Sequence, residues 1–274
     1  MQFITFSRKL GTNGARIAKR VSEQMGYAFH STETIETMAR GMGFNDDISN
    51  VNDKPSSGFR RFLPSKPKIQ LDRLSLAIYE LANKGNAVFL GRGSYIFLRS
   101  YQCALHVRVT ASMEKRIQNL IQRGFPHETV PEMIKKSDNE RSGYIKLFFN
   151  SDWDNPEMYD IVLNMDNISE DFAADTVIHM ARSEKIKGRL NEVTQALEKM
   201  CLLQRVSGVH AALMEAETFD PMSSNTEVSV LEPGCVQLTG VANDQATKDV
   251  IEKAIQEVKG VQKIDNKIIV VKYK

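Results

Sequence analysis

The fold is decided by the stretch Phe3-Ile4-Thr5-Phe6-Ser7-Arg8-Lys9-Leu10-Gly11-Thr12-Asn13-Gly14-Ala15-Arg16-Ile17-Ala18. Its apolar start, Phe3–Phe6, predicts a short buried strand, and residues 7–14 then predict a loop with two glycines. Apolar residues follow at helical spacing until Gly26, which predicts a helix that ends at that glycine. A strand, a glycine-bearing loop and a helix in this order open an α/β unit.

The same alternation continues through the first two thirds of the chain. Three further apolar strands are predicted at Ala87–Leu90, Leu105–Val109 and Ile161–Leu163, and helical patterns separate them. Strands that alternate with helices indicate a mostly parallel sheet covered by helices, so we expect one such domain over residues 1–182. Residues 45–68 are rich in Asn, Asp, Ser, Pro and Lys without periodicity, and we interpret them as a mobile connection.

After position 182 the pattern changes. Residues 183–207 carry the apolar spacing of an amphipathic helix, which we interpret as a connector. Residues 208–274 then predict a small α+β domain in the order helix, strand, strand, helix, strand. Its first two strands form a hairpin at Pro233-Gly234, and its last strand is predicted between Val261 and Val271.

The composition is typical of a soluble protein with two domains, because the chain has 274 residues, of which 42% are hydrophobic and 26% charged. No run of about 18 apolar residues is present, so no integral membrane segment is expected. At the start of the chain apolar residues precede positive charge, which is the reverse of a secretory signal. We therefore expect a cytoplasmic protein. The three cysteines lie far apart and no histidine stands at ligand spacing, so no metal site is predicted.

The charges are unevenly distributed along the chain. Residues 208–274 hold seven lysines, ten acidic residues and no arginine, so every arginine precedes position 206. Arginine is the side chain best suited to bidentate contact with phosphate. Phosphate chemistry is therefore expected in the first domain, and no nucleic-acid partner is expected.

Phosphate binding is predicted for the loop formed by Gly11, Thr12, Asn13, Gly14 and Ala15. The N–H groups of such a loop converge on one point, where the start of the following helix adds positive potential. The usual signature, GxxxxGK[ST], also supplies a lysine and a hydroxyl. Here Gly14 stands in the place of the lysine. Arg16, one turn into the helix, is the first candidate for the missing cation and Lys9 is the second; an ordinary glycine turn is the alternative interpretation of the loop alone.

Several segments follow this opening in a recognisable series. Residues 89–93 read FLGRG, 105–111 read LHVRVTA, 137–144 read SDNERSGY and 152–164 read DWDNPEMYDIVLN. This series, over about residues 1–182, resembles the cytidylate kinase-like family. Members of that family have a similar opening, ISRQLGSGG, which also lacks the lysine of the phosphate loop.

The resemblance implies a P-loop NTPase-like fold and a kinase that uses ATP, Mg²⁺ and a nucleotide substrate. It implies that Asp138 and Arg141 belong to a lid helix over the phosphates, where the arginine stabilises the transferring group. With Arg16 they are the candidate catalytic residues. The alternative at this i,i+3 spacing is a solvated ion pair. Arg92, which follows a strand end, and Arg116 are the implied substrate-binding residues.

Two positions depart from the family pattern. Leu90 stands where cytidylate kinases place an aspartate that helps to read the base, and Gly93 replaces a following acidic residue. The resemblance therefore does not carry cytosine specificity over to this chain.

The carboxy-terminal residues also resemble a known family. Residues 228–230, 234–241 and 258–268 are similar to a BON domain, over about residues 208–272. BON-like domains are associated with membranes or small ligands, but the acidic balance and the lack of arginine argue against anionic lipid. We expect a small ligand or a protein as the partner of this domain, and the oligomeric state stays open.

Two functions remain in competition. The first is ATP-dependent phosphoryl transfer to a nucleoside monophosphate, cytidylate-like, or to a related small acceptor. The second is a catalytically degenerate module that senses a nucleotide, with the BON-like domain binding a ligand of its own. The missing lysine favours the second, and the segment that contains Asp138 and Arg141 favours the first.

Overall fold

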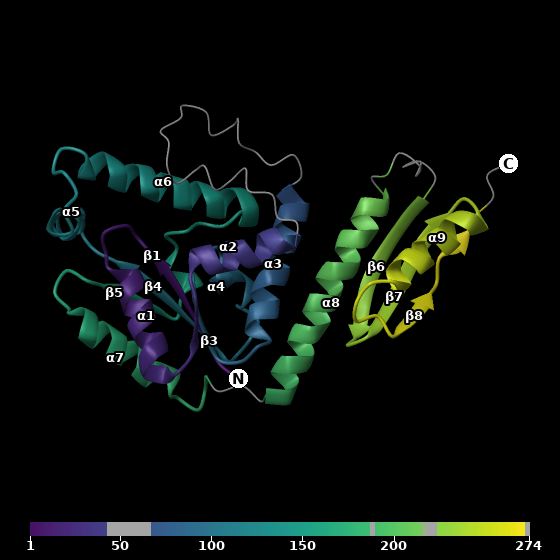
Figure 1. The fold of residues 1–274 in the computed structure, drawn as a ribbon, viewed down its shortest axis with the longest axis horizontal. Coiled ribbons are helices and arrows are strands. Elements are labelled where there is room, and N and C mark those ends of the chain that lie inside the picture. The colour runs from purple at the N-terminus through teal and green to yellow at the C-terminus, as the bar shows by residue number, and fades with distance from the viewer. Residues whose placement is uncertain (43–66, 187–189, 215, 217–223, 272–274) are drawn as a thin grey trace. The chain divides into compact units, whose positions relative to one another are not determined.

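The computed structural model describes residues 1–42, 67–186, 190–214, 216 and 224–271. The chain divides into two compact units, Met1–Arg189 and Leu190–Lys274, each with its own sheet and apolar core (Figure 1). Apart from its last two residues, the connection predicted over 45–68 lies outside the described residues.

The first unit is built on a five-stranded sheet in the order β2-β3-β1-β4-β5. Every strand pair is parallel. The strands are β1 (Phe3–Arg8), β2 (Ala28–His30), β3 (Ala87–Leu90), β4 (Ala104–Thr110) and β5 (Ile161–Asn164). Together with the small α+β second unit, this confirms the predicted fold class, a parallel sheet covered by helices and followed by a small α+β domain.

Helices cover both faces of this sheet (Figure 1). They are α1 (Gly14–Met25), α2 (Thr32–Gly41), α3 (Pro67–Ala82), α4 (Ser94–Phe97), α5 (Met113–Gln122), α6 (Val130–Phe149) and α7 (Glu170–Ala181), with a 3₁₀ turn at Pro156–Met158. Helices α1 and α7 lie side by side and share one apolar cluster with the sheet, to which β1 contributes Ile4 and Phe6 and α1 contributes Ile17 and Val21.

The strand order determines where a ligand can bind. Strand β1 lies between β3 and β4, and the chain passes from β1 to the β2-β3 side before it crosses to β4 and β5. In open parallel sheets the crevice at such a reversal, outside the carboxyl ends of the strands, is the usual binding site. The loop after β1 and the turn after β3 therefore lie at the same edge of the sheet.

Three elements differ from the sequence-based expectation. Strand β1 continues to Arg8, whereas a loop was expected from Ser7, because pairing with β4 continues at Ser7↔Arg108 and Arg8↔Val109. Strand β2 was not predicted, since three residues are too few to show a period of two. Helix α7 was not predicted either, because its buried face is largely alanine, which gives a weak apolar pattern.

The second unit combines two helices with a four-stranded sheet. Its elements are α8 (Leu190–Met214), β6 (Ser224–Glu232), β7 (Cys235–Ala242), α9 (Gln245–Gln256), β8 (Lys263–Asn266) and β9 (Ile269–Val270). Helix α8 is continuous through positions 207 and 208, where the sequence had suggested that a connector ends and a new domain begins. Leu202 and Val206 of α8 pack with Val236 and Leu238 of β7 in the core of this unit.

The last strand is divided in two. Strand β8 pairs with the start of β7, and β9 pairs with its end at Val241 and Ala242. Between them the backbone N–H of Ile268 donates to the side-chain oxygen of Asn266 at 3.0 Å, and Ile268 is buried in the core. This local hydrogen bond competes with the strand ladder, which explains the interruption of the strand predicted between Val261 and Val271.

A pair of glycines in this unit gives a test of the hairpin. Gly240 has φ +112°, and a Cβ there would stand 2.1 Å from the carbonyl oxygen of Asn225, whereas Gly208 lies in α8 with nothing within 4 Å. We expect Gly240→Ala to destabilise the unit by roughly 1–3 kcal/mol or more. Gly208→Ala, the matched control, is expected to stabilise it by about 0.5–1 kcal/mol. Hydrogen exchange of the β6 and β7 amides in the full chain measures both; unchanged exchange in Gly240→Ala would contradict the geometry.

Candidate active site

The loop between β1 and α1 is tightly held. Gly11 has φ +84°, and a Cβ at this position would come 2.7 Å from the carbonyl oxygen of Arg116. Thr12 is buried and its hydroxyl donates to the carbonyl of Lys9 at 2.8 Å. Asn13, at φ 59°, donates from its side chain to Glu170 at 2.9 Å. These contacts hold the loop in place through its glycine backbone and its side chains, and several of its backbone N–H groups are not used.

Four backbone N–H groups of this loop are left without a partner. Within the described residues, the amides of Leu10, Gly11, Asn13 and Ala15 make no hydrogen bond. They precede or begin the 12-residue helix α1, whose amino-terminal end carries positive potential. Unused amides at a helix start are the arrangement that binds phosphate groups.

Arg8, the last residue of β1, directly precedes this loop, and sequence reasoning missed it. Its Nη2 donates to the hydroxyl of Thr32 at 3.2 Å, and Thr32 in turn donates to the carbonyl of Leu90 at 2.9 Å. In the described part of the chain no carboxylate forms an ion pair with Arg8. Burial, followed by the charges of Arg141 and Arg92, lowers the pKa of Arg8 to about 9. Within the described residues, the positive charge of Arg8 therefore has no carboxylate paired with it.

The absence of a lysine at position 14 has a steric reason. A Cβ at Gly14, the position of the absent lysine, would lie 2.7 Å from the Cβ of Arg8 and 3.1 Å from that of Val109. At the far end of the Arg8 side chain, a Cβ at Gly91 would lie 2.6 Å from Nη1. A side chain at position 14 would therefore overlap the base of the Arg8 side chain, and the glycine at position 91 leaves room for its guanidinium.

Arg141 comes from the middle of α6 and is attached to the same strand end. Its Nη1 donates to the backbone carbonyl of Arg8 at 2.7 Å. Burial lowers the pKa of Arg141, the charge of Asp138 raises it, and the charges of Arg116 and Arg108 lower it further. No ion pair joins it to a carboxylate within the described residues. Arg141 is the second cation of the site that lacks an anion.

Arg116 and Asp138 form a bidentate ion pair. The two Nη atoms of Arg116 donate to the two carboxylate oxygens of Asp138 at 2.8 and 2.7 Å. The Nε of Arg116 donates to the carbonyl of Leu10 at 2.6 Å, and Asn119 donates to the carbonyl of Gly11 at 2.8 Å. Arg116 thus ties the loop to α5 and α6. Asp138 pairs with Arg116 and not with Arg141, the partner suggested by the i,i+3 spacing.

Arg92 lies at the end of β3 and bridges two helices. Its guanidinium is bound by the carboxylate of Glu36, on α2, through Nε and Nη2. The same guanidinium lies 5.4 Å from the centre of the Tyr144 ring, on α6. Arg92 has φ 52°, between two glycines that also have positive φ. A backbone strain of this kind in a non-glycine residue is concentrated at functional sites.

Arg16, the first candidate for the missing cation, is engaged elsewhere. Its Nε lies 3.2 Å from Glu170, the first residue of α7, and its side chain is 70% exposed. Asn13 contacts the same carboxylate. Of the three predicted catalytic residues, the structure brings Asp138 and Arg141 to the loop, and it pairs Arg16 with α7. Ala15 is exposed beside it.

Lys9, the second candidate, belongs to a separate polar group. Its Nζ lies 3.2 Å from Asp154, which also binds the buried Arg108. The guanidinium of Arg108 lies 3.8 Å from the centre of the Trp153 ring and donates to the hydroxyl of Ser7 at 3.0 Å. Trp153 donates to the same hydroxyl at 2.9 Å. Lys9 and Arg108 both pair with the carboxylate of Asp154, whereas Arg8 and Arg141 form no ion pair among the described residues.

Sequence signals for the missed residues are few. An arginine directly after a buried apolar strand and before a glycine loop is one such signal, and Arg8 fits it. Glu36 and Thr32 gave no signal, because their partners lie 56 and 58 residues further along the chain.

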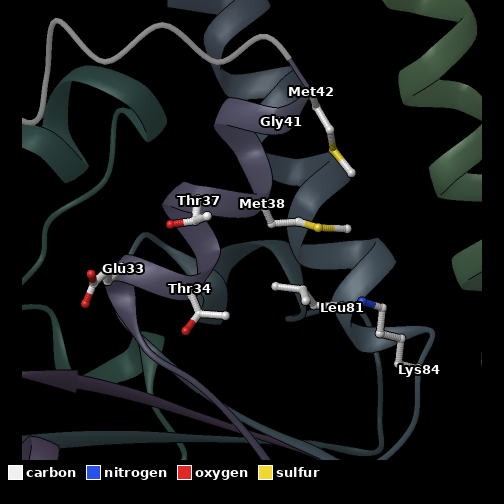
Figure 2. A pocket seen from close by; sticks show the side chains of 8 residues that line it. All are labelled: Glu33, Thr34, Thr37, Met38, Gly41, Met42, Leu81 and Lys84. Atoms are coloured by element: carbon white, nitrogen blue, oxygen red, sulfur yellow. The ribbon is translucent and has the colours of Figure 1, made fainter.

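A surface pocket lies on another side of α2 (Figure 2). It is lined by Glu33, Thr34, Thr37, Met38, Gly41, Met42, Leu81 and Lys84. None of the predicted site residues contributes to it. Glu36 lies on the opposite face of the helix, as its spacing from Thr34 and Thr37 requires.

The described residues contain no group of three or more His, Cys, Asp or Glu side chains placed to hold a metal ion. Thr12 has the only hydroxyl of the segment from Gly11 to Ala15, and that hydroxyl is hydrogen-bonded to the Lys9 carbonyl. The loop itself fits the phosphates of a nucleotide, through its unused amides. None of the described helices combines the length and apolar character needed to cross a membrane.

Residues 3–167 match the sequence model of the cytidylate kinase-like family. The chain belongs to this family. Residues 205–272 match the BON domain. Both resemblances are thereby confirmed, and the arginines and the loop described above all lie within the cytidylate kinase-like region. No curated protein matches the chain.

Among solved structures, the chain is similar to an uncharacterized protein from Eubacterium ventriosum, at 22% identity and a TM-score of 0.53, over 66% of this chain and 97% of that one. It also matches shikimate kinase from Acinetobacter baumannii in complex with shikimate, at 11% identity and a TM-score of 0.40, over 68% and 96% of the two chains. A third is the YorR protein of Bacillus subtilis in complex with phosphorylated GDP, at 10% identity and a TM-score of 0.41, over 69% and 100%. The first of these likenesses supports the fold of the first unit and indicates no substrate.

The steric relation between Gly14 and Arg8 can be tested directly. We expect Gly14→Ala to cost about 1–3 kcal/mol of stability, because its Cβ would overlap Arg8 and Val109. Gly14→Lys, which restores the usual lysine, is expected to cost at least as much and not to improve phosphate binding. Gly41→Ala at the end of α2, with nothing within 4 Å, is the control and should be close to neutral. Thermal unfolding of the full chain measures all three, and a Gly14→Lys protein as stable as wild type would show that the site has room for both cations.

Proposed function

We propose that the protein transfers a phosphoryl group from ATP to a nucleoside monophosphate, cytidylate-like, or to a related small acceptor. One observation carries this proposal: Arg8 and Arg141 have no carboxylate among the described residues and lie beside a loop with unused amides. Membership of the cytidylate kinase-like family supports the same activity.

The chemistry needs mainly positioning and positive charge. An acceptor oxygen attacks the γ-phosphorus, the bond to the β–γ bridging oxygen breaks, and ADP leaves with the electron pair. The loop amides would hold the donor phosphates, and Arg8 and Arg141 would offset the charge of the group in transfer. Magnesium supplies further neutralisation of the phosphates when bound, and it would be held mostly by phosphate oxygens and water, since the loop hydroxyl of Thr12 is engaged.

The remaining predicted residues take supporting roles in this proposal. Arg116 and Asp138 would position the loop against α6, because Nε of Arg116 donates to the carbonyl of Leu10 and both of its Nη atoms donate to Asp138. Arg92 would contact the acceptor. Arg16, with 70% of its side chain exposed, would reach the donor only by leaving Glu170.

A nucleotide sensor without turnover is the second candidate. It is favoured by the pairing of both substitute cations, Lys9 with Asp154 and Arg16 with Glu170, because neither is then available to the outer phosphates. A sensor that binds the nucleotide without transferring a phosphoryl group would hold its phosphates with the same loop amides and the same Arg8. Turnover separates the two functions.

We further propose a cytoplasmic location, where ATP is available, and a first domain that ends near residue 182. The BON-like unit would bind a small ligand or a protein, as the absence of arginine after position 206 makes anionic lipid a poor target. No nucleic-acid partner is proposed.

The first test is ADP release from Mg-ATP with CMP, UMP, AMP, GMP or dCMP as acceptor, against a control without acceptor. We expect Arg8→Met and Arg141→Ala each to lower kcat/KM by about 100-fold or more, because each removes a cation from the transferring group. Arg123→Met, at an exposed arginine directly after α5, is the matched control and should leave turnover unchanged.

A second readout separates loss of function from loss of fold. Burial and two neighbouring charges disfavour the charged form of Arg8 in the folded protein, so Arg8→Met should leave the ligand-free protein at least as stable as wild type. If turnover persists in folded Arg8→Met, the role given to Arg8 is wrong. If no acceptor raises ADP release although ATP binds, the sensor is the better description.

A further inference from the structure

The ion pair between Glu36 and Arg92 stands at the point where the acceptor would bind. Glu36 is only 7% exposed, and its carboxylate is held by Nε and Nη2 of Arg92, the side of the guanidinium that forms a fork. An arginine fork accepts a carboxylate or a phosphate in the same geometry. A carboxylate on this fork therefore occupies the place that an anionic group of the substrate would take.

The surrounding charge shows that one carboxylate does not neutralise this end of the sheet. Arg8, Arg92 and Arg141 are close enough for the charges of Arg92 and Arg141 to act on Arg8. Among the described residues, Glu36 is the one carboxylate that pairs with any of these three arginines. A doubly charged phosphate would complete the neutralisation, which a single carboxylate leaves unfinished.

Arg92 itself is held in position by backbone and not by Glu36 alone. Gly91, Arg92 and Gly93 all have positive φ, and a Cβ at Gly93 would lie 2.6 Å from the ring of Phe149, on α6. The ring of Tyr144 lies against the guanidinium from the same helix. Arg92 can therefore remain in place when its carboxylate partner changes.

Glu36 has a second cation to accept it. Its other carboxylate oxygen lies 3.4 Å from Nη2 of Arg40, one turn further along α2. A small shift of the carboxylate toward Arg40 would break its contact with Arg92 without leaving the charge unpaired. Arg92 could therefore exchange Glu36 for another anion while Glu36 stays paired with Arg40.

We propose that Glu36 is a built-in competitor for the phosphate of the acceptor: it holds Arg92 in the ligand-free protein and releases it when a phosphomonoester binds. The inference rests on the proposed phosphoryl transfer and specifies its acceptor. Neutral molecules cannot displace the carboxylate, so the site selects acceptors that already carry a phosphate. Glu36 is a specificity-determining residue, and it takes no part in the transfer itself.

The test compares phosphate binding by the full-length wild type, Glu36→Gln and Glu33→Gln, with inorganic phosphate as the probe and sodium chloride added to constant ionic strength. Glu33 is exposed, lines the surface pocket and lies one turn before Glu36 on α2, and within the described residues no hydrogen bond or ion pair joins it to Arg92, so Glu33→Gln removes the same charge from the same helix while the Arg92–Glu36 pair is kept. We expect Glu36→Gln to lower the Kd for phosphate about 5-fold or more, since the competitor is gone. Glu33→Gln should bind as wild type does.

The opposite result is equally clear. If Glu36 merely positions Arg92 for the ligand, folded Glu36→Gln will bind phosphate with the same or lower affinity, and the inference is overturned. Should Glu36→Gln fail to fold, Glu36→Asp keeps the charge and withdraws the carboxylate by one methylene; it is also expected to tighten phosphate binding, and an unchanged or weaker Kd would overturn the inference.

Kinetics distinguish this inference from the activity on which it rests. If the protein is a kinase, Glu36→Gln should lower KM for the phosphorylated acceptor and leave the binding of cytidine, which has no phosphate, unchanged. An unchanged KM would contradict the inference about Glu36, whereas turnover of the acceptor would still support the kinase proposal. If no acceptor is turned over, the phosphate titration still decides whether Glu36 competes for the anion.

Discussion

The positive charge of Arg8 is the constraint on which the site depends. A partly buried guanidinium whose one hydrogen bond goes to a hydroxyl group is unfavourable, as its lowered pKa indicates. The fold accommodates it because Gly14 leaves room beside its Cβ, Gly91 leaves room beside its Nη1 and Thr32 offers an oxygen. In the proposed function a bound phosphate would relieve this unfavourable charge, and that relief would contribute to the free energy of binding.

The other arginines of the site divide into two groups by their partners. Arg116 and Arg108 each have a carboxylate and donate to the backbone or to Ser7, which makes them part of the framework. Because side chains satisfy the carbonyls of Leu10 and Gly11, the loop is fixed through its oxygens and its N–H groups are left available. An anion site built in this way needs no rearrangement of the loop, which is the condition for electrostatic catalysis.

The sequence was sufficient for four of the five strands of the first sheet and insufficient for the partners of the charged side chains. Apolar strands and the glycine loop are local patterns, so β1, β3, β4 and β5 could be placed from residue types alone. The ion pairs are not local: the partner of Asp138 is Arg116 on another helix, and i,i+3 spacing pointed to Arg141 instead. Arg8 escaped notice because its role depends on the absence of a side chain at Gly14 and Gly91, which only the three-dimensional arrangement of the strands reveals.

An arginine from the strand is not equivalent to a lysine from the helix. A lysine presents a compact charge on a flexible chain, and it can follow a phosphoryl group as that group moves. A planar guanidinium with Gly91 beside its Nη1 presents directed donors and follows less readily. In the proposed transfer the reacting groups would therefore have to come to the cation, and the helices that carry Glu36 and Arg141 contact the strand ends where such movement would be needed. On that proposal, the selection of the substrate would depend on these helices more than on the loop alone.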